Sequence, residues 1–145
     1  MTQDSFTYNI TARCEAQKAI RLLSEFNQHS DLHPLIMHVE RVEAPQGVLR
    51  RYLITDQLKW GPFAFKIRYR ADILRVTDDE ILTEAFQSPN TTVTNQTTLT
   101  QHGDELHIQV KITMQAPSLL FGYAFHQAQT AHLEMARRIE KALTV

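Results

Sequence analysis

The sequence predicts an α+β fold in which a curved, seven-stranded antiparallel sheet wraps around one long C-terminal helix. Two observations support this fold class. Segments that alternate apolar and polar side chains fill residues 36–116, and short turns join them, which is typical of antiparallel neighbours. Residues 117–143 instead carry apolar side chains at helical spacing. At about 1.5 Å per residue, that helix is about 40 Å long and can cross the whole sheet.

The first part of the chain predicts one strand and two short helices. Residues 6–12 alternate apolar and polar side chains, as a half-buried strand does. Apolar residues from Ala16 to Phe26 fall on one helix face. A further single turn is capped by Ser30 and ends at Pro34, because the residue before a proline avoids helical geometry.

Six more strands are expected at residues 36–44, 48–60, 63–73, 80–87, 91–101 and 105–114. Proline- and glycine-containing turns separate most of them, such as Gly61-Pro62 and the hairpin signal His102-Gly103-Asp104. The last helix begins with Pro117, whose missing N–H costs nothing in a first turn. The order strand, two helices, six strands and a helix predicts one domain over residues 1–145.

Composition limits the function. A net charge of −1 attracts neither nucleic acid nor an anionic membrane. The basic row Lys66, Arg68 and Arg70 is expected on a solvated outer face, because the aromatic residues of the same strand point the other way. Cys14 is the only cysteine, and no apolar run reaches the roughly 18 residues of a membrane span. We therefore expect a cytoplasmic monomer or weak homodimer without metal, cofactor or stable membrane insertion.

The chain resembles the START-like helix-grip superfamily, the SRPBCC-type group of polyketide cyclases/dehydrases and lipid-transport proteins. The likeness rests on the opening strand and helix, His33-Pro34-Leu35-Ile36, Trp60-Gly61-Pro62, and the final helix with Pro117-Ser118-Leu119-Leu120 and Ala131-His132-Leu133. It implies a helix-grip fold that holds a small hydrophobic or amphipathic molecule between sheet and helix. Members cyclise or dehydrate substrates, transfer lipids or quinones, or act as recruitment modules, so the fold alone does not fix the function.

The walls of such a cavity are expected from aromatic residues on the strands and from small residues of the last helix. The expected ligand-binding residues are Tyr52, Trp60, Phe65, Tyr69, Phe86, Phe121, Ala124, Phe125 and Ala128. Ala124, Ala128 and Ala131 replace bulky residues in the middle of the helix. Small side chains there either let the sheet approach closely or leave room for a ligand.

Polar residues that share a strand face with apolar neighbours are the candidates for chemistry. They are Asp56, Glu84, Asn95 and Thr97. A carboxylate on an inward face is costly unless it is paired or reaches a wet cavity. Either a β-bulge turns Asp56 and Glu84 to water, or they line a pocket. In the second case Asp56, Glu84, Tyr52 and Tyr69 are candidate catalytic acids and bases.

The histidines favour structural roles. His29 and His33 have the spacing of two metal ligands on a helix, but Pro34 disrupts helical geometry at His33. We expect both in a solvated turn. His132 is expected to be a hydrogen-bonded core residue, and His107 is expected in water.

Three functions remain open. The first is a non-catalytic binding module for a lipid-, quinone- or polyketide-like molecule. The second is a cyclase or dehydratase that acts on an enolisable carbonyl, which requires at least two of the candidate acids and bases to lie within hydrogen-bond reach in the cavity. The third is an interaction protein with a vestigial cavity. Abundant inward aromatic residues without a catalytic constellation favour the first.

Overall fold

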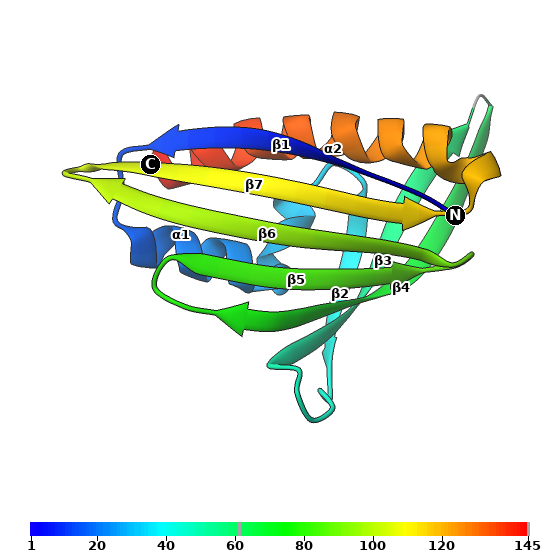
Figure 1. Ribbon diagram of the computed structural model, residues 1–145, viewed down its shortest axis with the longest axis horizontal. Coiled ribbons are helices and arrows are strands. Elements are labelled where there is room, and N and C mark those ends of the chain that lie inside the picture. Colours follow the sequence, from blue (N-terminus) through cyan, green and yellow to red (C-terminus); the bar gives the residue numbers. More distant parts are fainter. Residues whose placement is uncertain (61, 145) are drawn as a thin grey trace.

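Seven strands form one antiparallel sheet in the order β1-β7-β6-β5-β4-β3-β2 (Figure 1). The computed structural model describes residues 1–60 and 62–144, without the side chains of Gln28, Ser30, Asp31, Lys59 and Trp60. The elements are β1 (Thr2–Ala12), α1 (Ala16–Ser24), the 3₁₀ helix η1 (Phe26–Asp31), β2 (Ile36–Val42), β3 (Arg50–Trp60), β4 (Phe63–Val76), β5 (Glu80–Gln87), β6 (Thr91–His102), β7 (Glu105–Ala116) and α2 (Ser118–Thr144). The predicted fold class and order of elements are confirmed.

The sheet curls strongly. Figure 1 shows β1, β7 and β6 running alongside α2, whereas β3 and β4 rise steeply behind them. Register shifts between Ile36 and His38 in β2 and between Ile73 and Arg75 in β4 mark irregular pairing in the bent half. An extra residue on one strand increases its bend and twist. The curl produces a concave face toward the helices.

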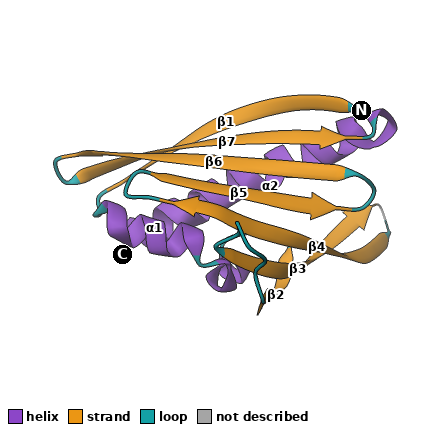
Figure 2. Cartoon of the chain, turned by 60° about the horizontal axis from the view of Figure 1, so that its bottom comes forward, coloured by secondary structure: helices purple, strands orange, loops and turns teal. Residues whose placement is uncertain are grey.

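The helix α2 covers only part of that face (Figure 2). Its buried residues are Ala131, Met135, Ile139 and Leu143, all in its C-terminal half. Met135, Ile139 and Leu143 help to close a core with α1, β1 and β5–β7. A second, smaller core joins η1 to β2–β4. The N-terminal half of α2 therefore lies over a part of the concave face that the two cores do not fill.

The outer face is polar, as predicted. Arg51 donates two hydrogen bonds to Asp72, at 2.7 and 2.9 Å, and Asp72 is only 3% exposed. The basic row lies on this face, where the Arg70 guanidinium stacks 4.2 Å from the centre of the Phe86 ring. His107 is solvent-exposed and bonds Glu105, which confirms its expected place in water.

The aromatic end of β4 is exposed. Phe63 shares the inward strand face with Phe65 but is 71% exposed rather than buried in the core. It pairs with Trp60 where β3 ends and β4 begins, beyond the reach of the two cores. Across the chain as described, no helix combines the length and apolar character needed to cross a bilayer.

Candidate functional site: a cavity between the sheet and the N-terminal half of α2

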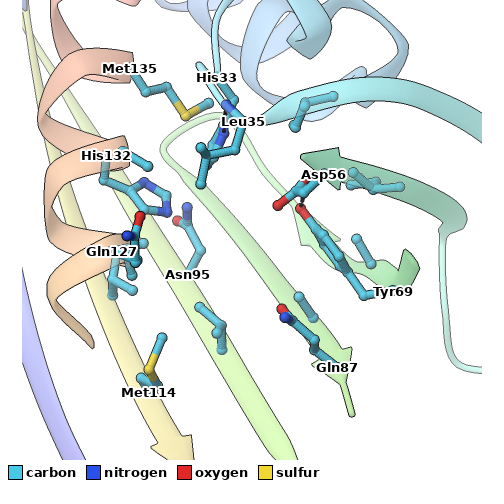
Figure 3. Close-up of a pocket in the computed structure, with 18 of the residues that line it drawn as sticks. His33, Leu35, Asp56, Tyr69, Gln87, Asn95, Met114, Gln127, His132 and Met135 are labelled. Carbon is cyan, nitrogen blue, oxygen red and sulfur yellow. Dashed lines mark hydrogen bonds between the residues drawn. The ribbon is translucent and has the colours of Figure 1, made fainter. Parts of the chain in front are cut away.

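A cavity of about 420 Å³ lies between the concave face and α2 (Figure 3). Its walls are mostly apolar side chains. They include Ile54, Leu58, Phe65, Ile67, Ala71, Ala85, Val93, Val110, Ile112, Met114, Ala124, Ala128, Ala131 and Met135. Among the bordering residues, Phe65, Leu120 and Tyr123 are 38, 42 and 40% exposed, so the cavity opens beside the N-terminal end of α2. The volume falls within the usual range for small-molecule sites.

The first polar group in the cavity is a pair formed by Asp56 and Tyr69. Asp56 continues the alternation of β3 without a bulge, so its side chain faces inward with Ile54 and Leu58. Tyr69 donates a hydrogen bond to Asp56 Oδ1 at 3.3 Å. Burial raises the pKa of Asp56 to about 6, which the Tyr69 hydrogen bond partly opposes, and burial also raises the pKa of Tyr69. Asp56 therefore changes its charge near neutral pH.

The second polar group joins β1 to α2 and to the segment that follows η1. The Tyr8 hydroxyl lies 3.0 Å from His132 Nδ1, and the His33 ring lies edge-on to the His132 ring with centroids 5.6 Å apart. Burial lowers the pKa of His132 to about 4 and that of His33 to about 3. Both imidazoles are therefore neutral near pH 7. The hydrogen bond to Tyr8 confirms the predicted role of His132.

The expectation of a solvated turn at His29 and His33 was wrong. His29 is 5% exposed, and its Nε2 donates to the carbonyl of Leu22 at 3.0 Å. His33 Nδ1 accepts from the backbone N–H of Leu35 at 3.2 Å. The 3₁₀ helix η1 and the segment that follows it turn His29 and His33, respectively, toward the cavity, an arrangement that local sequence periodicity does not encode. Within the described part of the chain, no three His, Cys, Asp or Glu side chains converge as metal ligands.

A third polar patch lies on β6. Asn95 and Thr97 line the cavity, and the Thr97 hydroxyl donates to Asn95 Oδ1 at 2.8 Å. Figure 3 shows Asn95 between His132 on α2 and the Asp56–Tyr69 pair on the opposite wall. Both β6 residues therefore line the cavity together with the apolar residues of their strand face.

Only some of the expected ligand-binding residues line the cavity. Phe65, Tyr69, Ala124 and Ala128 line the cavity. Tyr52 is only 1% exposed and packs against Phe26 in the smaller core. Phe86 lies under Arg70 on the outer face, and Phe121 stacks on Phe125, which packs edge-on against Phe6. The Trp60 side chain lies outside the described residues.

Glu84, unlike Asp56, faces outward, and it does so without the bulge that the sequence prediction invoked. It borders the cavity through its place in β5, but it alternates with the inward residues Thr83 and Ala85. It pairs across the sheet with Asp72, whose carboxylate binds Arg51 on the outer face. Its side chain therefore points away from the cavity. No bulge is needed in β5, because the face that Glu84 shares with Phe86 is the outer one.

The buried histidines make folding sensitive to acid. The unfolded chain takes up protons below about pH 6.5, whereas folded His29 and His132 stay neutral down to about 4 and His33 down to about 3. Their stabilising contribution is present above about pH 6.5 and is lost as the pH falls, by about 2 kcal/mol for each histidine at pH 5. Urea titrations across this range should show that loss. The free energy of unfolding should depend less on pH in His29→Gln than in the wild type, whereas His107→Gln should keep the wild-type dependence. If the wild type and both variants lose the same stability between neutral pH and pH 5, the buried histidines are not its cause.

Comparison with known proteins adds the fold relationship. No protein-family model and no curated protein matches the chain. Among solved structures, the di-domain aromatase/cyclase StfQ of the steffimycin biosynthetic pathway matches with a TM-score of 0.77 and 12% identity over 97% of this chain. This chain spans half (50%) of that protein's length.

Two further solved structures match along nearly their whole length. A START superfamily protein from Mycobacterium smegmatis matches with a TM-score of 0.73 and 10% identity, covering 96% of each chain. The ZhuI aromatase/cyclase from Streptomyces sp. R1128 matches with a TM-score of 0.68 and 11% identity over 98% of this chain and 94% of its own. At such low identity the likeness establishes the shared fold and leaves the function to the site.

Proposed function

Because the chain has the START-like helix-grip fold, we propose that residues 1–145 form a single domain that binds a small hydrophobic or amphipathic molecule between the sheet and α2. The observation that carries this proposal is the cavity of about 420 Å³ with largely apolar walls. Burial of apolar ligand surface in such a space is favourable by about 25 cal/mol per Å². A few polar groups then orient the ligand. A lipid-, quinone- or polyketide-like molecule meets these requirements.

Fluorescence titration tests this function. N-phenyl-1-naphthylamine is an uncharged probe whose emission rises in apolar surroundings, and we expect it to bind saturably with one site per chain. Native mass spectrometry of the freshly purified protein should also detect a co-purified small molecule or the added probe at one-to-one stoichiometry. The proposed function would be overturned if micromolar to millimolar probe produced no saturable fluorescence and if native mass spectrometry detected no bound molecule.

A cyclase or dehydratase activity is the second candidate, and one observation favours it. Asp56 and Tyr69 both line the cavity and lie within hydrogen-bond reach of each other. A carboxyl whose pKa is raised to about 6 is suited to proton transfer near neutral pH. Solved aromatase/cyclases share this fold, which agrees with such a role but is not the evidence for it. In this activity Asp56 takes a proton from the carbon next to a ketone, and Tyr69 helps to position the carboxylate.

Deuterium exchange tests this activity without the natural substrate. With 2-tetralone in D₂O, the protein should accelerate the exchange of the α-protons as followed by proton NMR, and Asp56→Asn should lose about 100-fold of that acceleration. Asp104→Asn, at the exposed β6–β7 turn, is the matched control and should retain it. Exchange at the buffer rate, or equal rates in the wild type and Asp56→Asn, would contradict the enzymatic candidate while leaving the binding function intact.

A further inference from the structure

We propose that the cavity selects a molecule without a negative charge that presents a carbonyl oxygen to the His132–His33 wall and a hydroxyl group to Asp56 on the opposite wall. This inference rests on the proposed binding function and specifies its ligand class. It follows from three features of the described lining residues: the donors on one wall, the acceptor on the other, and the charges that the lining lacks.

The histidine wall offers N–H donors. His33 Nδ1 accepts from the Leu35 N–H, so in the neutral ring the proton sits on Nε2. In His132, Nδ1 faces the Tyr8 hydroxyl, which is the better donor of that pair. We therefore assign the His132 proton to Nε2 as well. Neither Nε2 has a hydrogen-bond partner among the residues that the structure describes, and both rings border the cavity. A ligand oxygen with free lone pairs, such as a ketone oxygen, satisfies two such donors.

The Asp56 wall offers an acceptor. Tyr69 donates to Oδ1, and Oδ2 has no donor within the described chain. Asp56 is 9% exposed and lines the cavity, so a bound ligand can reach this carboxylate. An acceptor that loses water to an entering ligand without gaining a donor costs about 1–3 kcal/mol. A ligand hydroxyl that donates to Oδ2 removes this cost, whereas an ether or a methyl group at the same place does not.

The charges of the lining disfavour anions. None of the described residues around the cavity is Lys or Arg, and the three histidines that border it are neutral near pH 7. The positive charge of Arg138 on α2 contributes to the lowered pKa of His33. Arg138 itself forms an ion pair with Glu134 at 3.5 Å and does not line the cavity. A carboxylate, sulfonate or phosphate inside would lose its water without gaining a cation and would face Asp56. Fatty acids and phosphorylated ligands are therefore poor occupants.

The two walls lie on opposite sides of one space. In Figure 3, His132 and His33 project from the side of α2 and the segment before β2, and Asp56 and Tyr69 lie across the cavity on β3 and β4. Asn95 lies between them, where its amide can contact the middle of a ligand. The expected ligand therefore carries its carbonyl and hydroxyl groups at opposite ends of a rigid apolar body.

Four naphthalene derivatives test the inference by displacement of N-phenyl-1-naphthylamine at pH 7. 6-Acetyl-2-naphthol carries both groups at opposite ends, 2-naphthol lacks the carbonyl, 2-acetylnaphthalene lacks the hydroxyl, and 6-hydroxy-2-naphthoate has a carboxylate in place of the acetyl group. We expect 6-acetyl-2-naphthol to bind about tenfold tighter than either compound with one group, and the naphthoate to bind more weakly than 2-naphthol.

Variants assign the groups. His132→Phe should remove most of the advantage of 6-acetyl-2-naphthol over 2-naphthol, while the same substitution at exposed His107 should leave it unchanged. Because His132→Phe leaves the Tyr8 hydroxyl unpaired, the double variant Tyr8→Phe/His132→Phe provides a second test with no buried orphan group. Circular dichroism checks that each variant is folded.

The outcomes separate the two levels of the proposal. If the naphthoate binds as tightly as the acetyl compound, or if both His132 variants keep the acetyl advantage, the ligand class is overturned while the binding function stands. If N-phenyl-1-naphthylamine itself does not bind, the binding function fails first.

Discussion

Ala128→Phe is expected to lower the affinity for N-phenyl-1-naphthylamine by about 100-fold or more, because the added ring occupies the space that the probe needs. Ala128 lies in the N-terminal half of α2 and lines the cavity, where the two cores do not reach. The new side chain therefore enters the cavity without displacing the packed residues Met135 and Ile139. We expect the thermal midpoint to stay the same or to rise, since the substitution buries apolar surface in a hollow.

The matched control is Ala142→Phe, on an exposed position of the same helix. It should bind the probe as the wild type does. Two findings would contradict this account: wild-type affinity in Ala128→Phe, or an equal loss in both variants. The first would place the probe elsewhere on the protein, and the second would mean that any added aromatic ring on α2 disturbs the fold.

Asp56→Asn is expected to remove a pH dependence of stability that the wild type has. The free energy of unfolding of the variant minus that of the wild type should be about 2 to 3 kcal/mol larger at pH 8 than at pH 4. Burial raises the pKa of Asp56 from 3.8 to about 6. A raised carboxyl pKa means that the folded chain binds more protons than the unfolded chain between these values. The contribution of Asp56 is thus fully present below about pH 4 and is lost as the pH rises through 6. Asparagine has no such loss and can still accept from Tyr69.

Urea titrations of both proteins from pH 4 to pH 8 measure this difference, and the effects of the buried histidines cancel because both proteins contain them. Asp104→Asn should show no comparable change, because that side chain is exposed. A constant difference between Asp56→Asn and the wild type would indicate that Asp56 is solvated in solution. It would also weaken its assigned role as the acceptor for a ligand hydroxyl.

Much of the fold could be predicted because the hydrophobic pattern changes period along the chain. The alternation in β4 and β7 and the helical spacing of α2 are long and regular, and the predicted ends of these elements differ from the observed ones by only a few residues. The two-residue turn Gly103-Asp104 followed directly from its sequence, and Gly103 adopts the positive φ of 64° that such a turn requires. These features depend on local sequence alone.

The site could be predicted only in part, because its geometry depends on long-range packing. Alternation shows which residues of β5 share a face, but it does not show which face is concave. Leu82, Glu84 and Phe86 share one face of β5, and the register with β4 places that face outside. The position of Asp56 could be stated only as alternatives, because a bulge is not visible in a single sequence. The pairing of Tyr8 with His132 spans 124 residues and had no local signal.

Methyl NMR of methionine tests the central claim most directly. The chain contains four methionines. Met114 and Met135 line the cavity, whereas Met1 and Met37 are 65 and 46% exposed elsewhere. On titration of ¹³C-methyl-labelled protein with 6-acetyl-2-naphthol, the account predicts saturable shifts of the Met114 and Met135 methyl signals and almost none for Met1 and Met37. Shifts confined to the exposed pair, or no shift of any methyl group at millimolar ligand, would contradict it.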